Sequence, residues 1–152
     1  MDLYVVLKYV HVVLAIVAVG FNASYGIWLA RAAREPAHLG HVLRGVKILD
    51  DRFANPAYGL LLVTGLAMVF VGGIPLLQTR WLVSALVLYA LLLVVGFFVY
   101  SPSLRQQIAL LDTAGPASAG YLAAASRGRI VGIALAVIVL AIVFLMVVRP
   151  AV

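Results

Sequence analysis

Charged residues are absent from four long stretches of this chain, and each stretch is rich in apolar side chains. The uncharged stretches are residues 9–30, 53–79, 81–104 and 130–148. Each can hold the run of about 20 apolar residues that a membrane-spanning helix needs. The link between the second and third stretches is short, which favours antiparallel neighbours. The pattern therefore predicts an all-α membrane protein whose four transmembrane helices form an up-down bundle.

Residues 35–51, between the first two spans, have an amphipathic pattern. Pro36 can open a helix, because the N–H that proline lacks is not needed in a first turn. The apolar residues of this helix share one face and the polar ones lie mostly on the other: Leu39, Val42, Leu43, Val46 and Leu49 against His41, Arg44, Lys47 and Asp51. We predict a short amphipathic helix on the membrane surface between helices 1 and 2. The alternative is a cytoplasmic helix packed on the bundle.

Turn and cap residues set the expected ends of the helices. The first helix should cover 3–33, and the second should begin near 53, where Asn55 can cap it and Pro56 suits its first turn. The third is expected over 81–100, before Pro102, with 103–112 continuing outside the membrane. The Ala-, Gly- and Ser-rich residues 113–126 predict a loose loop before a fourth helix over 128–148. Asp50 falls near the apolar face of segment 35–51, and we expect it to pair with a basic neighbour: Arg44, Lys47 or Arg52.

The composition is typical of a protein that lies within a lipid membrane. Of its 152 residues, 66% are hydrophobic and 11% are charged, whereas a soluble domain carries about 25% charged residues. The length fits one transmembrane domain over 1–152. The net charge of +6 does not indicate nucleic acid, because the charges sit in loops beside apolar spans. The absence of cysteine excludes disulfides and thiolate metal sites.

The distribution of basic residues predicts the orientation. Eight lie in or beside the first and third loops: Arg31, Arg34, Arg44, Lys47, Arg52, Arg105, Arg127 and Arg129. Three lie on the opposite side: Lys8, Arg80 and Arg149. Because Lys and Arg are enriched on the cytoplasmic side of a membrane, we expect both termini outside and the two long loops in the cytoplasm. The protein should be a multi-pass protein of the cell's inner (cytoplasmic) membrane.

A polar stripe runs down the first predicted helix. Its members are spaced by three and four residues and so share one side: Tyr4, Lys8, His11, Ala15, Ala18, Asn22 and Tyr25. Polar and ionisable side chains are costly in lipid, so the stripe should face the protein interior. Lys8 is close enough to the outer edge to snorkel to the headgroups. His11 and Asn22 either form a polar clasp between helices or belong to a functional site.

The stripe includes candidate ligands for haem b. His11 lies deep in the span, and haem iron is held by histidine or by a His/Met pair. Antiparallel packing brings Met68 and Met146 level with His11, so either is a candidate second ligand. Small residues between His11 and Asn22 would let a flat cofactor approach. The predicted cofactor-binding residues are therefore Lys8, His11, Asn22, Met68 and Met146, with His11 as the metal ligand.

Small residues also repeat on the fourth predicted helix. Gly128, Gly132 and Ala136 are four residues apart, a spacing typical of close helix packing. The partner is another helix of this chain, which we favour, or a second copy in a homodimer.

Several short motifs resemble a known group of membrane proteins. They are Lys8-x-x-His11 followed by Arg31, then Asn55-Pro56, Thr64-Gly65, Trp81-Leu82 and Ser101-Pro102. Over essentially the whole chain they resemble a bacterial family of predicted integral membrane proteins of unknown function. More distantly, the chain is similar to the copper resistance D membrane domain and to the J-type protoporphyrinogen oxidase family, which share Lys-x-x-His on the first helix.

The oxidase resemblance implies a haem-binding bundle with His11 as a ligand. The sequence departs from that family on the third helix. Val83, Ser84 and Ala85 stand where the family has its lysine, and residues 81–100 lack its histidine.

A complete catalytic set is missing from the sequence. It contains no Ser/His/Asp grouping, P-loop, HExxH motif or pair of carboxylates within a span. We therefore predict an integral membrane protein in contact with the lipid bilayer, with the Lys8/His11 stripe binding haem or taking part in redox chemistry. Enzymatic activity is left open, and a non-enzymatic role is favoured. The alternative is a non-catalytic accessory or assembly subunit that contacts another membrane protein. Transport ranks third, because four spans with few polar groups leave little room for a pathway.

Overall fold

The computed structural model describes residues 2–150 of the chain. These residues form six α-helices: α1 (Leu3–Ala32), α2 (Pro36–Leu49), α3 (Asn55–Val71), α4 (Arg80–Val95), α5 (Ser101–Ala114) and α6 (Ala119–Val148). Two π-helical turns, η1 (Asp50–Ala54) and η3 (Gly96–Tyr100), and one 3-10 turn, η2 (Leu76–Gln78), connect some of them.

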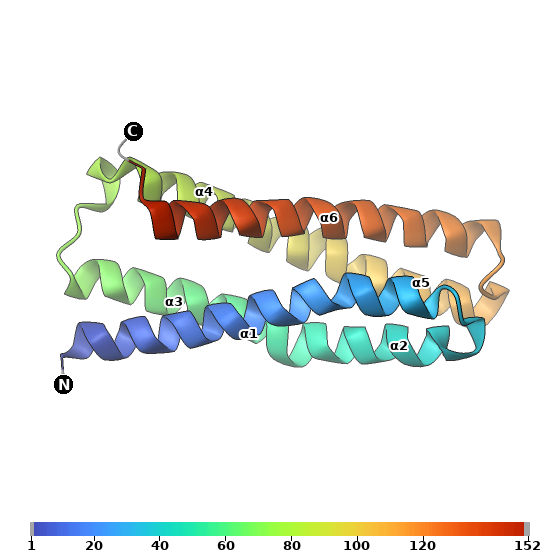
Figure 1. Cartoon of the computed structure of the whole chain (residues 1–152). Helices are drawn as coiled ribbons and strands as arrows, with labels where there is room; N and C mark the ends of the chain where they lie inside the picture. The colour runs from blue at the N-terminus through green and yellow to red at the C-terminus, as the bar shows by residue number, and fades with distance from the viewer. Residues whose placement is uncertain (1, 151–152) are drawn as a thin grey trace.

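The helices combine into four long antiparallel segments (Figure 1). Helices α2 and α3 are continuous through η1 over Pro36–Val71, and α4 and α5 are continuous through η3 over Arg80–Ala114. Together with α1 and α6, these are the four helices of the described chain that are long and apolar enough to cross a membrane. At 1.5 Å per residue, the 30 residues of α1 extend about 45 Å, which matches a bilayer with its headgroup regions. The predicted all-α four-helix membrane bundle is confirmed.

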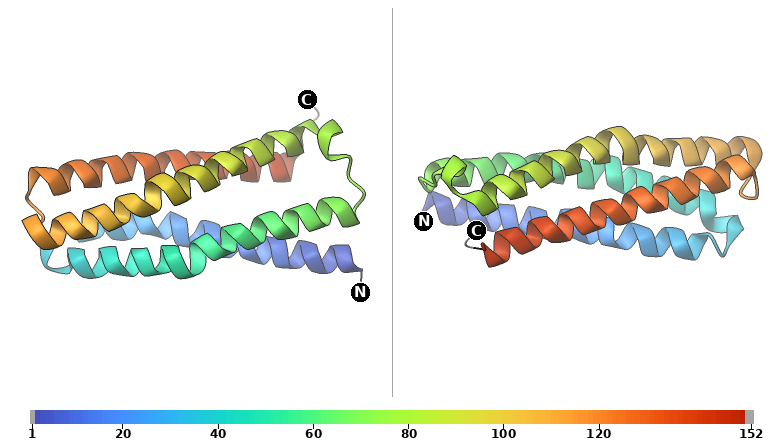
Figure 2. Two further views of the ribbon diagram at one scale, coloured as in Figure 1. Left: turned by 180° about the vertical axis from the view of Figure 1, so that it is seen from behind. Right: turned by 90° about the horizontal axis from the view of Figure 1, so that it is seen from above.

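The four segments form a ring, and α1 and α6 are the neighbours within it that contact each other least. Helix α1 packs along α2 and α3, α2 contacts α5, and both α4 and α5 pack on α6. The views in Figure 2 show the same arrangement from behind and from above. The start of α1 and the end of α6 lie at the same end of the bundle (Figure 1). One lateral face of the bundle is therefore bordered by the first and last helices of the chain.

Each π turn ends directly before a proline-containing first turn. Pro56 is the second residue of α3, and Pro102 is the second residue of α5. A proline inside a helix has no N–H to donate, and its ring collides with the carbonyl four residues earlier. One extra residue in the preceding turn relieves the collision: the N–H of Asn55 bonds to the carbonyl of Asp50, and the N–H of Ser101 bonds five residues back in the same way. The long helices thus continue through their prolines.

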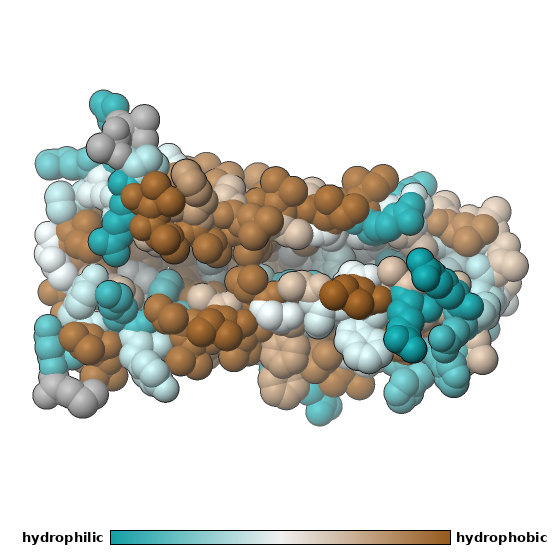
Figure 3. All heavy atoms as spheres, viewed as in Figure 1, coloured by the Kyte–Doolittle hydropathy of each residue, from teal (hydrophilic) through white to brown (hydrophobic). Residues whose placement is uncertain are grey.

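Two buried apolar clusters fill the bundle. The cluster nearer the chain ends contains Ala18, Ala54, Ala57, Tyr58, Leu61, Leu92, Val139 and Ile142. The cluster nearer the loops after α1 and α5 contains Tyr25, Ala32, Leu39, Leu43, Val46, Tyr100, Leu104 and Tyr121. Outside, large apolar side chains such as Phe70 and Phe98 are exposed, and Figure 3 shows an apolar belt with hydrophilic residues toward the ends. A belt of this size is suited to lipid and far exceeds the patches that soluble monomers expose.

The prediction that segment 35–51 lies on the membrane surface as a separate helix is wrong. Helix α2 continues into α3 and packs against α1 and α5. Its apolar face, including Leu39 and Leu43, is buried inside the second cluster. Arg44 on its outer face pairs with Asp112 of α5 at 2.7 Å. The amphipathic pattern therefore serves packing within the bundle, which was the alternative.

The loop predicted over residues 113–126 is much shorter in the structure. Helix α5 ends at Ala114 and α6 already begins at Ala119. The Ser118 hydroxyl caps α6 by accepting a hydrogen bond from the N–H of Tyr121 at 3.2 Å. Alanine is the strongest helix former, and it decides the conformation of this Ala-rich segment more than its Gly and Ser residues do.

Candidate functional site

His11 and Thr64 form a polar clasp between α1 and α3. His11 Nδ1 lies 2.9 Å from Thr64 Oγ1. The Thr64 oxygen also lies 2.8 Å from the backbone carbonyl of Leu60. When the hydroxyl donates to this carbonyl, its oxygen accepts a hydrogen bond from the Nδ1–H tautomer of His11. Gly65 makes room for the ring, because a Cβ at this position would lie 3.1 Å from His11 Cε1. The His11 ring is thus held closely against α3.

A second set of hydrogen bonds ties α1 and α4 to α3. Asn22 Nδ2 donates to the Tyr58 hydroxyl at 2.6 Å. The Tyr89 hydroxyl donates to the backbone carbonyl of Tyr58, also at 2.6 Å. From His11 to Asn22, therefore, the polar members of the stripe face the protein interior as predicted.

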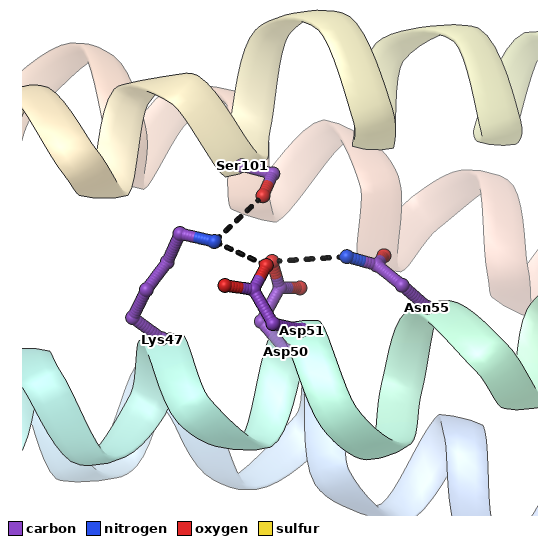
Figure 4. Close-up of polar contacts among 5 residues, drawn as sticks. All are labelled: Lys47, Asp50, Asp51, Asn55 and Ser101. Atoms are coloured by element: carbon purple, nitrogen blue, oxygen red, sulfur yellow. Dashed lines mark hydrogen bonds and ion pairs between the residues drawn. The ribbon is translucent and has the colours of Figure 1, made fainter.

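A buried polar cluster lies where η1 approaches the start of α5 (Figure 4). Lys47 on α2 is only 8% exposed. Its Nζ donates to the Asp51 carboxylate, and it donates to Ser101 Oγ at 3.1 Å. The ammonium group is therefore engaged by groups from two different long helices.

Asp50 belongs to the same cluster and is more deeply buried, with 4% of its surface exposed. Asn55 Nδ2 donates to Asp50 Oδ2 at 3.3 Å. Within residues 2–150, no basic side chain lies within the 4.0 Å of its oxygens that defines a salt bridge. The salt bridge predicted for Asp50 is made by Asp51 instead, so that prediction is wrong. A buried carboxylate without an ion pair is costly, which makes Asp50 the most unusual group of the bundle.

A cavity of about 760 Å³ lies between α1 and α6. Its walls come from these two helices, and its lining also includes residues of α2, η1, α3, α4, η3 and α5 and of the connection between α5 and α6. The space-filling view shows the hollow between α6 above and α1 below (Figure 3). Most of the lining is apolar, and polar side chains stand at a few points, among them Asn22, Tyr25, Asp50, Asn55, Tyr100 and Arg129.

Tyr25 combines complete burial with an unused polar group. The residue is 1% exposed, and its hydroxyl has no hydrogen-bond partner among the described residues. Buried hydroxyls are satisfied in most proteins, because an unpaired one costs about 1–3 kcal/mol. Tyr25 also lines the cavity, so the unused polar group and the cavity belong to the same part of the bundle.

The small residues of α6 pack against other helices of the same chain. A Cβ at Gly128 would collide with the Gln107 side chain of α5, and one at Gly132 would lie 3.5 Å from the Tyr100 ring. The close packing expected within the chain is therefore observed. Ala136, the third member of the repeat, lines the cavity.

The structure does not gather the five predicted cofactor ligands at one place. Lys8 is exposed near the outer end of α1, as snorkelling requires. Met146 packs against the first apolar cluster, and Met68 lies half-buried on α3. Of the five, only Asn22 lines the cavity. Among residues 2–150, no three His, Cys, Asp or Glu side chains come together as a metal site.

Sequence reasoning did not predict the Lys47–Asp50–Ser101 cluster. One signal was available: Asn55-Pro56 and Ser101-Pro102 each place a polar residue before a proline on a long helix. Such pairs mark interruptions of a helix, and the π turns they produce bring Asp50 and Ser101 into the interior.

The fold and the site together define a multi-pass helical membrane protein with a lateral cavity. A family model described as "Predicted integral membrane protein (DUF2269)" matches residues 5–150. The chain belongs to this family, as its motifs predicted. Comparisons with curated proteins and with solved structures gave no match.

Proposed function

We propose that this protein binds a membrane-soluble small molecule in the cavity between α1 and α6, and that it does so as a binding module. The observation that carries the proposal is the cavity itself, which is mostly apolar with a few inward polar groups. That combination is typical of small-molecule sites, whose volumes run from about 300 to 1,000 Å³. An apolar ligand dissolved in the bilayer can reach the cavity sideways, between the two helices that contact each other least.

Two glycines of α1 provide a matched test. Gly26 lines the cavity and Gly20 does not, and a Cβ at either position would have no neighbouring atom within 4 Å. Gly26→Leu should therefore fill part of the cavity, whereas Gly20→Leu adds the same side chain to the outer surface.

The probe is a C16 methyl ester that carries a diazirine, applied to the protein in lipid nanodiscs, with labelled residues mapped by mass spectrometry. We expect the unmodified protein and Gly20→Leu to be labelled at lining residues such as Leu29. Gly26→Leu should lose most of that labelling and keep it at the outward-facing Phe144. Labelling of outward-facing residues alone, equal in all three proteins, would refute the proposal.

Haem binding at His11 is a second candidate, favoured by one contact. Thr64 holds Nδ1, which leaves Nε2 as the coordinating nitrogen, and such second contacts are usual for histidine ligands. Neither His11 nor Met68 nor Met146 lines the cavity, so the predicted ligand set does not fit haem there. A Soret band that disappears in His11→Ala would establish this candidate, and identical spectra without such a band would remove it.

A role as an accessory subunit is the remaining alternative, supported by the lack of a complete catalytic set in the sequence. Chemical crosslinking followed by native purification would test it. A stoichiometric membrane partner is the expected result under this alternative, and a clean monomer contradicts it.

For the orientation, we propose that both termini lie outside the inner membrane and that the opposite end of the bundle, with the connections at residues 33–35 and 115–118, lies in the cytoplasm. The excess of Lys and Arg toward that end supports this. The chain lacks cysteine, so single-cysteine labelling is unambiguous. A membrane-impermeant maleimide should label Gln78→Cys in intact cells and Thr113→Cys only after permeabilisation. The reverse pattern would invert the orientation.

A further inference from the structure

We infer that the cavity selects a long-chain amphiphile whose polar end donates hydrogen bonds, such as a primary amine or a hydroxyl group, and that the Asp50 carboxylate receives this end. The inference rests on the proposed function and specifies its ligand class. The inference follows from the pairing of the charged groups: Lys47 is engaged by Asp51 and Ser101, whereas Asp50 forms no salt bridge within residues 2–150.

Lys47 forms no salt bridge with Asp50 within the described residues, although its charge is close enough to attract the carboxylate. Its Nζ is committed to Asp51 and Ser101, and Figure 4 shows the Asn55 amide as the group that reaches Asp50. One neutral amide at 3.3 Å leaves most of the acceptor capacity of a carboxylate unused, because the group can accept about four hydrogen bonds. Burial of such a group requires donors or a cation.

The unused groups of Asp50 and Tyr25 belong to the same cavity. Both residues line it, both are more than nine-tenths buried, and the Tyr25 hydroxyl has no partner within the described chain. An amine or hydroxyl can donate to Asp50 and also exchange a hydrogen bond with Tyr25. The two side chains are close enough to interact electrostatically, so one ligand group of this chemistry can reach both.

The charges of the lining argue against an anionic head at this position. Asp50 is the carboxylate on the lining, and Arg129, the one basic residue of the lining, is exposed on α6. A phosphate or carboxylate placed against Asp50 would meet a like charge in surroundings of low dielectric constant, where repulsion is strong. The apolar remainder of the lining suits a hydrocarbon chain.

The test compares three diazirine probes with the same C16 chain and different ends: a primary amine, an alcohol and a methyl ester. The protein is studied in nanodiscs, and the half-saturating probe concentration for labelling of lining residues is measured. We expect the amine and the alcohol to saturate at about tenfold lower concentration than the ester, the effect of one hydrogen bond to a charged group.

Two variants and one control assign this preference to residues. Asp50→Asn should reduce the preference for the amine to within about twofold, while ester labelling of the cavity stays unchanged and reports an intact fold. Tyr25→Phe removes a hydroxyl that bonds to nothing in the protein, and should weaken the amine and alcohol more than the ester. Asp112→Asn, on the outer surface, should behave like the unmodified protein.

The outcomes separate this inference from the proposed function. Equal labelling of the cavity by all three probes, unaffected by Asp50→Asn, would overturn the inference and leave the cavity as a binding site. Failure of every probe to label the cavity would overturn both. Competition by phosphatidylethanolamine but not phosphatidylcholine would identify a bilayer lipid as the source of the amine. Amine labelling insensitive to both lipids, with the Asp50 dependence retained, would identify a free single-chain amphiphile.

Discussion

The two ends of the polar stripe on α1 have opposite characters. At its outer end, His11 is pressed against α3, bonded to Thr64 and fitted over Gly65. At its inner end, Tyr25 is more deeply buried and its hydroxyl has no partner among the described residues. It lines a cavity together with Asp50, whose carboxylate forms no salt bridge within residues 2–150. The type of a polar residue in a membrane helix therefore does not tell whether its polar group already has a hydrogen-bond partner. His11, which looks the most reactive from sequence, is held against α3 through one ring nitrogen, whereas the less conspicuous Tyr25 has a hydroxyl without a partner in the described chain.

The largest expected difference between the two ends is in the stability lost when a bulky side chain is added at each. Gly65→Leu should destabilise the protein by about 1–3 kcal/mol, because its side chain overlaps the His11 ring. Gly26→Leu, on the cavity side of α1, should change stability by about 0.5 kcal/mol or less. Unfolding in mixed micelles of sodium dodecyl sulfate measures both. Since each substitution is Gly to Leu within a helix, helix propensity cancels, and equal losses would show that the two ends are packed alike.

A smaller effect distinguishes them by hydrogen bonding. Thr64→Val leaves the His11 N–H unpaired and should cost about 0.6–1.7 kcal/mol, the range for polar pairs between membrane helices. Tyr25→Phe breaks no bond within the described chain and should be neutral within about 0.5 kcal/mol. The same unfolding assay applies. A loss for Tyr25→Phe as large as that for Thr64→Val would mean that the Tyr25 hydroxyl has a structural partner.

The smallest expected effect on stability comes from an ion pair on the outer surface, near the inner end of the stripe. Arg44 and Asp112 form an ion pair in which about half of each side chain is exposed. Such pairs contribute less than about 1 kcal/mol and weaken with salt. Arg44→Ala should therefore lower stability slightly at low ionic strength and by a smaller amount at 1 M salt, where the Debye length is about 3 Å. A large, salt-independent loss would indicate that Arg44 contributes by packing rather than by charge.

The sequence was sufficient for the four spans, their antiparallel order and the inward direction of most of the stripe. These features follow from the absence of charge and from helical spacing, which act over many residues at once. The partner of His11 was predicted less well. The expected depths of the residues in the membrane put Met68 level with His11, whereas the structure pairs His11 with Thr64, one helical turn away from Met68. A shift of one turn along the axis depends on how two helices pack, and neither helix encodes it alone.

The cavity end was the least predictable part. Helical spacing predicts Asp50 near an apolar face, but the π turn that begins at Asp50 adds a residue and rotates the helix beyond it. The periodicity of 3.6 residues does not extend across such a turn. The amphipathic pattern of segment 35–51 predicts a surface helix for the same reason. The continuity of this segment with α3 depends on how Pro56 is accommodated, and an amphipathic pattern carries no information on that.

The position of α1 and α6 as the first and last helices has one more consequence. Every other pair of neighbouring segments is joined by a connecting peptide, whereas within residues 2–150 none joins these two (Figure 1). If the proposed ligand binds, a hydrocarbon tail longer than the cavity can extend between these helices into the surrounding acyl chains without crossing any connection of the described chain. The volume of the cavity would then limit the head and the first part of the tail and not the total length of the molecule.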